Sequence, residues 1–413
     1  MKRDLLQQAY SAMRHDLRKT LLTMLGMAWG IATVVLLLAY GEGFGRAIQS
    51  IFESYGATAV GIFPGRTSQE MGGNKAGVQV RFTDDDVELL RNVIPLARRV
   101  ARQGYVSATV VNSPRSVTLD VLGIDPSLQA IWNLDLDSGR FLNDQDTLSR
   151  GLYAVLGSEA KDKLFSGVPA VDQTIRINDV SFQVVGVLQP RMQESGDNTN
   201  RVVYITYGSM GVLQDTHYIN GIWMDSLGLD HDHLTTAIRG ALAAAHNFKA
   251  DDQRAVFVFD AQKQLSQFGI IILGIKILLA FIGTVTLGIG GVGLMNIMLV
   301  SVTQRTREIG VEKALGARRR DILFQFLAEA LVITGAGGVL GILLSYAVAF
   351  SVGRLTLYSA MAKYAAAGDI RLVVAPRILL IASGILGLVG ILSGMFPAMR
   401  AANLDPIEAL RYE

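Results

Sequence analysis

The 413-residue sequence contains no cysteine, which excludes disulfides and cysteine-ligated metal sites and is compatible with an oxidising compartment. Charged residues are also scarce, at 18% of the chain, and a net charge of +2 gives no reason to expect a nucleic-acid partner. The phosphate-binding pattern Gly-x-x-x-x-Gly-Lys-Ser/Thr is missing, so the sequence as given does not encode a P-loop ATPase. Evidence for the function must therefore come from the residues that are abundant.

Hydrophobic residues make up half of the chain, and 43 residues are glycine, a composition unlike that of an ordinary soluble enzyme. The apolar residues gather in four runs, each long enough for the roughly 20 helical residues that cross a hydrocarbon layer. The runs are Thr20–Tyr40, Gly269–Val300, Phe326–Val352 and Ile378–Ala398. We predict four transmembrane helices. A cleaved signal peptide is an alternative for the first run, but this run exceeds a signal core of about 7 to 15 residues and lacks a clear cleavage site.

Basic residues are unevenly distributed around the four runs. Residues 1–20 contain five Lys or Arg, the loop 301–325 contains six and the tail after Met399 contains two, against four in the loop 353–377. By the positive-inside rule, both termini and the loop 301–325 face the cytoplasm. The long region between the first two spans then lies outside.

This outer region has the patterns of an α+β domain. The segment "FTDDDVELLRNV" begins with Thr83 as a helix cap, and Asp86 follows three residues later. Segments such as "GYVSATVV", "SVTLDVLGID" and "RVVYITY" have strand patterns and are separated by turn residues. We therefore predict a membrane α-helical protein of four transmembrane helices, with a large extracytoplasmic α+β domain inserted between spans one and two.

The patterns divide the chain into four parts. They are an amphipathic helix on the cytoplasmic face, the first span with a stalk, the outer domain with a β-rich lobe between two helix-strand parts, and a region with the other spans. Their boundaries are 1–19, 20–44, 45–262 (helix-strand parts about 45–111 and 221–262, lobe about 112–220) and 263–413 (spans about 269–300, 326–352 and 378–398). The stalk is expected because the helix entering the second span is longer than the bilayer needs, and Lys276 fits the membrane interface there.

Small residues inside the runs predict close helix packing. Three pairs of glycines have the small-xxx-small spacing that favours helix contacts in lipid: Gly26 and Gly30, Gly337 and Gly341, Gly390 and Gly394. The segment "GIGGVG" (Gly288–Gly293) superficially resembles a dinucleotide fingerprint. It lies in a membrane run without a preceding strand, so we interpret it as a packing segment as well.

Polar residues give few candidates for chemistry. His231 and His233 share one face of an extended segment, but no further metal ligands are indicated nearby, and a solvated loop or helix start is the favoured interpretation. Asn296 and Glu329 lie inside membrane runs, where an ionisable group is by default a functional candidate. For Glu329 we favour a structural ion pair with the Arg318–Arg320 cluster over a proton pathway. We identify no catalytic residue and no metal site.

The segment 303–321, "TQRTREIGVEKALGARRRD", concentrates six basic and three acidic residues between two apolar runs. A solvated loop that attracts anionic lipid explains its arginine cluster. It does not explain the preceding residues, where acids alternate with bases at helical spacing. Val311, Ala314 and Leu315 form a narrow apolar stripe that we expect to face the helix bundle, with mixed charges outward.

Gly316 is placed to end this short helix. A cytoplasmic helix with one face for the bundle and one mixed-charge face suits docking to a protein, because mixed charge confers register and specificity. The charged segment is therefore the main candidate site.

Several segments resemble one family. "GGVGLMNIMLVSVTQRTREIGVEKALGARRRDILFQFLAEALVI" and the tail "FPAMRAANLDPIEALRYE" resemble the FtsX-like permease domain of MacB-type ABC transporters. "LRKTLLTMLGMAWGIATVVLLLAYGEG" resembles the first span of that family. "VLGIDPSLQAIWNLDLDSGRFLNDQD" and "VLGSEAKDKLFSGVPAVDQTIRINDVSFQVVGVL" resemble its periplasmic core domain. The resemblance covers nearly the whole chain.

The resemblance implies a homodimer in the bilayer of a bacterial inner membrane, with both termini cytoplasmic and a large periplasmic domain. An ABC ATPase subunit would bind ATP and Mg, and this chain would bind no cofactor and catalyse no reaction. Some members carry the ATPase on the same chain, but this chain starts directly at the membrane helix, so we expect a separate subunit. The residues that match the family's ATPase-docking segment are Arg305, Arg307, Glu308, Gly310, Ala314, Leu315 and Gly316.

Glu312 and Lys313 belong to the same segment, at positions where family members often have two basic residues, and Met399 replaces a common arginine. The departure at Glu312 indicates a dedicated ATPase partner. The implied mechanism is mechanotransmission, in which ATP-driven closure of the partner moves the docking helices and, through the first two spans, the periplasmic domains.

The expected function is export or efflux of drugs, peptides or lipid-like molecules, with a periplasmic adaptor protein and an outer-membrane duct as further partners. An FtsX-like transmembrane signal transmitter that controls cell-wall hydrolases is the alternative from another class. A permease that extracts lipoproteins shares the same topology. The large outer domain and its periplasmic motifs favour the transporter.

Overall fold

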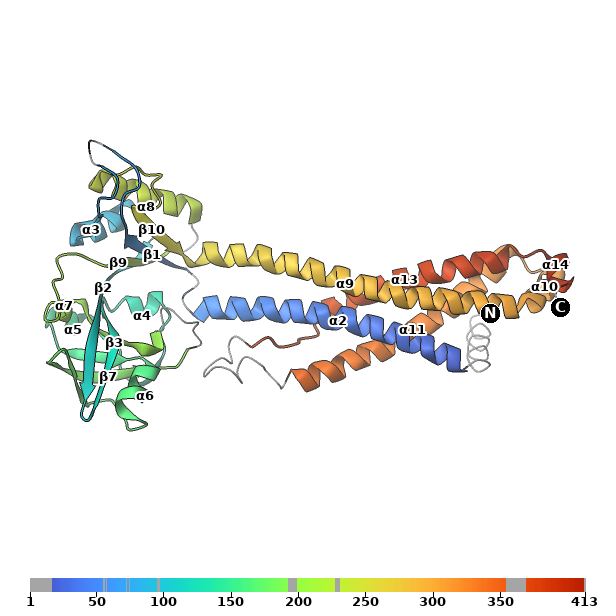
Figure 1. Cartoon of the computed structure of the whole chain (residues 1–413), viewed down its shortest axis with the longest axis horizontal. Helices are drawn as coiled ribbons and strands as arrows, with labels where there is room; N and C mark the ends of the chain where they lie inside the picture. The colour runs from blue at the N-terminus through green and yellow to red at the C-terminus, as the bar shows by residue number, and fades with distance from the viewer. Residues whose placement is uncertain are drawn as a thin grey trace. The chain divides into compact units, whose positions relative to one another are not determined.

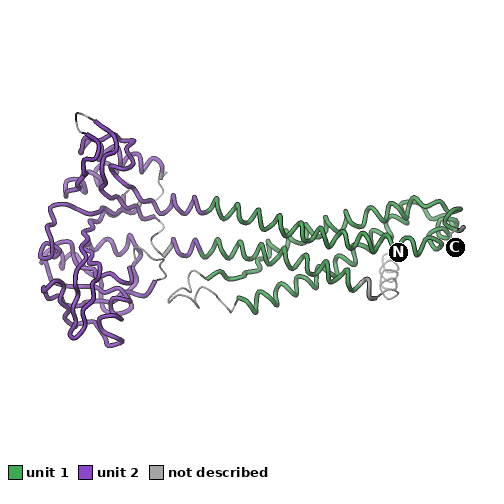
Figure 2. The backbone as a smooth tube through the Cα atoms, in the orientation of Figure 1, with its two compact units in different colours: residues 1–47, 269–357, 369–413 green, residues 48–268, 358–368 purple. Residues whose placement is uncertain are grey.

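The computed structural model describes residues 17–54, 56, 58–71, 73, 75–94, 97–191, 199–226, 231–353 and 369–411. Most of the predicted amphipathic helix over 1–19 lies outside these residues. The described chain forms two compact units (Figure 2). The first contains residues up to 47, 269–353 and 369–411, and the second contains the described residues of 48–268.

The first unit is built from long apolar helices (Figure 1). Among the described residues, four helices are long and apolar enough to cross a membrane: α2 (Leu17–Ser54), α9 (Ala261–Gln304), α11 (Arg319–Val352) and α13 (Pro376–Ala402). The unit also contains the short helices α10 (Thr306–Ala314) and α14 (Pro406–Arg411). The prediction of four transmembrane helices is confirmed.

Two of these helices are longer than a bilayer requires. α2 and α9 contain 38 and 44 residues. At 1.5 Å per residue they reach about 57 and 66 Å, against a hydrocarbon thickness of about 30 Å. Both helices continue along the chain from the first unit into the second, and their excess length is what the predicted stalk requires.

Two clusters of buried apolar residues hold the helices of the first unit together. One lies between α2, α9 and α13 and includes Met27, Leu287 and Leu386. The other lies between α9, α10, α11 and α13 and includes Ile309 and Phe326. Many other apolar side chains of these helices are exposed, as expected for residues that face lipid.

The second unit contains a mixed sheet of ten strands within the described residues. The strands are β1 (Ala59–Pro64), β2 (Ala97–Asn112), β3 (Arg115–Ile124), β4 (Leu136–Gly139), β5 (Tyr153–Leu156), β6 (Thr174–Ile177), β7 (Val180–Leu188), β8 (Val202–Thr206), β9 (Gly221–Ser226) and β10 (Val256–Asp260). The helices are α3 (Asp84–Val93), α4 (Leu128–Ile131), α5 (Asp144–Leu148), α6 (Ser158–Phe165), the 3₁₀ helix η1 (Thr199–Arg201), α7 (Tyr207–Met210) and α8 (His231–His246). The predicted α+β class is confirmed.

Strand pairing divides this sheet into two parts. β10, β1, β9 and β2 are antiparallel neighbours. β2 then continues into a closed circuit, in which β2, β3, β8, β5, β7 and β6 pair in turn and β6 returns to β2. Buried residues from all six strands, among them Val110, Val121 and Phe182, form one core that also includes Leu164 of α6.

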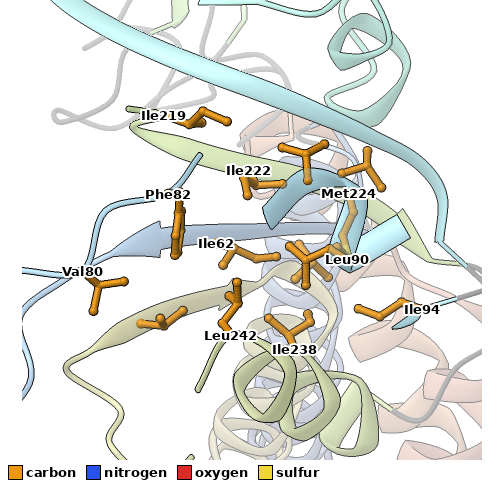
Figure 3. Close-up of a cluster of buried hydrophobic side chains, with 14 of the residues drawn as sticks. Ile62, Val80, Phe82, Leu90, Ile94, Ile219, Ile222, Met224, Ile238 and Leu242 are labelled. Atoms are coloured by element: carbon orange, nitrogen blue, oxygen red, sulfur yellow. The ribbon is translucent and has the colours of Figure 1, made fainter. Parts of the chain in front are cut away.

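α3 and α8 pack against the four-stranded part of the sheet (Figure 3). α3 begins at the predicted cap, where the side chain of Asp86 accepts a hydrogen bond from the backbone N–H of Thr83 at 2.8 Å. Leu90 of α3 and Ile238 of α8 meet Ile62 of β1 in a buried apolar cluster. This cluster fixes the two helices on the sheet.

Candidate functional site

α10 is the centre of the candidate site, because it separates the second and third spans and carries the mixed-charge part of the segment 303–321. Its buried residues are Thr306, Ile309 and Gly310. An added Cβ at Gly310 would lie only 2.8 Å from the Cβ of Ala409 in α14. The helix is therefore held against the bundle by a face of small and apolar residues.

The apolar stripe predicted to face the bundle is wrong, because all three of its residues, Val311, Ala314 and Leu315, are exposed. Val311 and Leu315, which we expected to face the bundle, are 44% and 84% exposed. The buried face follows the i, i+3, i+4 spacing of residues 306, 309 and 310 instead. Close approach to α14 requires a glycine, and this requirement outweighs the apolar character of the expected stripe.

An ion pair joins the start of α10 to α11. Nη1 of Arg305 lies 3.3 Å from Oε2 of Glu329, and the two side chains are only 27% and 13% exposed. Glu329 thus has an ion-pair partner, but the predicted partner was wrong. Arg318–Arg320 lie nine to eleven positions before Glu329, or about 14 to 16 Å along a helix, whereas the turn between α9 and α11 brings Arg305 alongside.

The side chain of Lys313 contacts the carboxyl end of α13. Its Nζ donates a hydrogen bond to the carbonyl oxygen of Ala402 at 2.9 Å and another to that of Leu404. Carbonyls at the end of a helix lack intrahelical donors and carry the negative end of the helix dipole, so an ammonium group stabilises them. In this arrangement the Lys313 charge serves the helix bundle.

α10 ends at the predicted glycine. Gly316 has a φ of +102°, which favours glycine. Its N–H donates to the carbonyl oxygen of Lys313 at 3.1 Å, and the N–H of Ala317 donates to that of Glu312 at 3.1 Å. This pair of hydrogen bonds is a Schellman motif.

The other docking candidates lie on the open side of α10. Arg307, Glu308, Ala314 and Leu315 are exposed, and Glu312 is half-buried. The open side therefore offers a base, an acid and an apolar side chain within three helical turns. Such a surface can pair with charges of both signs around an apolar contact.

The predicted packing glycines differ in how closely a neighbouring helix approaches. An added Cβ would lie within 2.9 Å of a side chain on another helix at five of the six positions: Gly30, Gly337, Gly341, Gly390 and Gly394. The closest approach is 1.9 Å, to Ile31 at Gly341. Gly26 differs, because nothing lies within 4 Å of an added Cβ there.

The remaining polar candidates form no site in the described part of the chain. Asn296 is exposed on α9, and His231 and His233 lie in the first turn of α8. Among the residues that the structure describes, no group of three or more His, Asp or Glu side chains is placed to hold a metal ion.

A charged cluster around Glu42 of α2 was missed by the sequence interpretation. The Glu42 carboxylate is 12% exposed and accepts hydrogen bonds from Nζ of Lys276 on α9 at 2.9 Å and from Arg377 on α13. Arg46 lies 3.4 Å away, one turn along α2. In the sequence, only Lys276 stood out, as a lysine near the end of an apolar run. Its partner Glu42 is distant in sequence, so no local pattern indicated the pairing.

The second unit contains a cleft of about 520 Å³ that is lined by four arginines and two aspartates. Three of these arginines are already paired. Arg91 lies 2.7 Å from Glu88, Arg99 lies 2.9 Å from Asp225 and Arg102 lies 2.8 Å from Asp125. Hydrogen bonds from Arg102 to Asp125 raise the pKa of Arg102 further above its ordinary value. Because the charges of the cleft are largely balanced by these ion pairs, it is a weaker candidate for a functional site than α10.

The fold and the site together define a class: a four-span membrane protein with an α+β domain between its first two spans and a short charged helix between the second and third. Residues 20–241 match the MacB-like periplasmic core domain, and residues 280–406 match the FtsX-like permease C-terminal region. The chain therefore belongs to the MacB/FtsX family.

Known relatives resemble the chain over nearly its full length. It is 31% identical over 417 residues to the macrolide export ATP-binding/permease protein MacB of Bdellovibrio bacteriovorus, covering 99% of this chain and 61% of that protein. It is also 31% identical over 415 residues to the MacB protein of Shewanella sp. (strain ANA-3), covering 99% and 60%. The chain thus spans about three-fifths of the length of these relatives.

The crystal structure of the periplasmic region of MacB from Actinobacillus actinomycetemcomitans aligns with 54% of this chain and 97% of its own, with a TM-score of 0.43 and 18% identity. The extracellular domain of the noncanonic ABC-type transporter YknZ from Gram-positive bacteria aligns with 49% of this chain at a TM-score of 0.41 and 18% identity.

Proposed function

We propose that the chain is the permease subunit of an ABC transporter, in which an ATPase subunit docks on α10 and drives motion of the periplasmic domain. The observation that carries the proposal is the two-sided environment of α10. Thr306, Ile309 and Gly310 are buried in the bundle, while Arg307 and Glu308 are exposed. A helix held on one side and open on the other can receive a force and pass it to the spans.

The proposed location is a bacterial inner membrane, with both termini and α10 in the cytoplasm. The excess of Lys and Arg in the loop 301–325 supports this orientation. ATP and Mg would bind to the ATPase subunit, whose closure would move α10 in each copy of a permease homodimer. The length of α2 and α9 suits transmission of that motion to the periplasmic side.

The substrates that fit the proposal are drugs, peptides or lipid-like molecules, delivered to a periplasmic adaptor protein and an outer-membrane duct. The relatives' name, macrolide export protein, supports export of this kind. Stimulation of the ATPase by the adaptor would support efflux. Activation of a cell-wall hydrolase, or release of an acylated protein to a carrier, would replace efflux by one of the two alternatives.

Charge reversal on the open side of α10 tests the docking proposal. Arg305 is unsuitable for this test because it pairs with Glu329. The double variant Arg307→Glu/Glu308→Lys changes only exposed side chains, so we expect the helices to fold and co-purification of the ATPase to be lost. Retention of both co-purification and coupled ATP hydrolysis would show that α10 is not the docking site.

A further inference from the structure

We propose that the ion pair of Arg305 and Glu329 and the hydrogen bonds of Lys313 are two links that couple α10 to the third and fourth spans. On this proposal Arg305 and Lys313 are positioning residues and not contacts to the ATPase. The inference rests on the proposed function, because it says how a force received by α10 is distributed within the membrane unit.

The first link lies at the start of α10. Glu329 is 13% exposed and its neighbours along α11, Phe326 and Ala330, belong to a buried apolar cluster. A carboxylate in such surroundings needs a partner, because an unpaired charge there is strongly unfavourable. Arg305 supplies that partner at 3.3 Å and fixes the start of α10 to the third span.

The second link lies at the other end of α10. Nζ of Lys313 donates to the carbonyl oxygens of Ala402, the last residue of the fourth span, and of Leu404 just beyond it. An ammonium group has three donors, so one side chain can bind both carbonyls at once. The Ala402 carbonyl is one of the groups that a helix end leaves without intrahelical donors, and Leu404 lies two residues beyond that end.

Close packing between the two links restrains sliding of α10. An added Cβ at Gly310 would lie 2.8 Å from Ala409, so α10 and α14 are in near-backbone contact at this point. The third and fourth spans are also tightly packed, since an added Cβ at Gly394 would lie 2.6 Å from the Cβ of Ala330. A displacement of α10 therefore reaches both of these spans directly, in addition to α9, to which it is joined through the chain.

The links divide the docking segment into two sets of residues. Arg305, Gly310 and Lys313 act within the bundle. Arg307 and Glu308 remain for the partner. Residues of both sets alternate between positions 305 and 313. The sequence motif therefore does not show which residues belong to which set.

The links can be tested without the ATPase. The chain has no cysteine, so nitroxide labels can be placed on exposed residues by Leu315→Cys with Ile407→Cys, and by Leu315→Cys with Phe324→Cys. We expect narrow distance distributions for both label pairs. Lys313→Met should broaden the distribution between positions 315 and 407, and Glu329→Gln should broaden that between positions 315 and 324. Lys313→Arg and the charge swap Arg305→Glu/Glu329→Arg should restore narrow distributions. Unchanged widths in Lys313→Met and Glu329→Gln would overturn the proposal.

A second measurement uses the full chain with its co-purifying ATPase. Lys313→Met and Glu329→Gln should leave ATPase co-purification intact but reduce the coupled response, measured as adaptor-stimulated ATP hydrolysis, by about tenfold. The two rescuing variants should restore it. Loss of co-purification in Lys313→Met would make Lys313 a docking contact. If the unsubstituted chain binds no ATPase, the proposed function fails, and the label distances still decide whether the links exist.

Discussion

Nζ of Lys276 on α9 lies 2.9 Å from Oε2 of Glu42 on α2, so an ion pair connects the two long helices that continue into the periplasmic domain. Arg377 of α13 donates to the other carboxylate oxygen of Glu42. One mostly buried carboxylate thus binds basic side chains from two other helices. We therefore expect it to contribute to the stability of this part of the bundle.

Replacement of Glu42 should therefore destabilise the membrane unit. Glu42→Gln removes the charge that Lys276 and Arg377 share, and we expect a loss of about 1.5–3 kcal/mol, the range for hydrogen bonds to charged groups. Arg46→Gln is the matched control, because Arg46 is 55% exposed and 3.4 Å from the carboxylate, and such exposed pairs contribute less than about 1 kcal/mol. Thermal unfolding in detergent compares them. Equal effects of the two substitutions would refute a central role for Glu42.

A substitution at Gly341 tests whether close packing of α2 and α11 requires a glycine at this position. An added Cβ at this position would lie 1.9 Å from Ile31 and 2.4 Å from the carbonyl oxygen of Ala28. Gly341→Ala should therefore force α2 and α11 apart and cost about 1–3 kcal/mol, as other overpacked sites do. Gly335→Ala on the same helix should be harmless, because nothing lies within 4 Å of its added Cβ. Melting temperatures that fall equally for both variants would exclude close packing as the cause.

Asp252 organises a loop of the periplasmic domain. Its side chain is 1% exposed and accepts hydrogen bonds from the N–H of Ser68 at 2.6 Å, the hydroxyl of Ser68 at 2.7 Å and the N–H of Gln69 at 3.1 Å. Asp252→Asn should lose about 1–3 kcal/mol and speed limited proteolysis at the segment around Ser68. The neighbouring Asp251→Asn, at an exposed residue, is the control and should change neither.

The contribution of Asp252 to stability should depend on pH. Burial by itself would raise the pKa of Asp252, but the hydrogen bonds from Ser68, Arg254 and Gln69 outweigh burial and lower it. A lowered folded-state pKa means that the stabilisation is complete above the unfolded-state value near 3.9 and is lost as the pH falls through the lower folded-state value. The difference in melting temperature between the unsubstituted chain and Asp252→Asn should therefore be constant above about pH 5 and shrink at lower pH. A difference that grows towards acid pH would contradict this assignment.

Local signals in the sequence predicted much of the fold. Four apolar runs predicted the spans, the Thr83–Asp86 spacing predicted the start of α3, and Gly316 predicted the end of α10, because each feature is decided by residues close together in the chain. The α+β class followed in the same way from alternating segments.

The site depended on contacts between distant residues, which local patterns do not contain. Glu42 and Lys276 are 234 positions apart. The buried face of α10 is set by Ala409, almost one hundred residues after Gly310. The apolar stripe of Val311, Ala314 and Leu315 was therefore assigned to the wrong side. The docking motif drew attention to α10, but only the contacts show which of its residues pack against the bundle.

In the proposed mechanism, a force applied at α10 moves the periplasmic domain. A nitroxide placed by Leu148→Cys, at a residue that is 79% exposed, reports the separation of the two periplasmic domains in the proposed homodimer. With the ATPase bound, a non-hydrolysable ATP analogue should shift the distance distribution in the otherwise unsubstituted chain. We expect no shift in the Arg307→Glu/Glu308→Lys background. A shift of equal size in that variant, or no shift at all when the ATPase is bound to the chain without these two substitutions, would rule out transmission of force through α10.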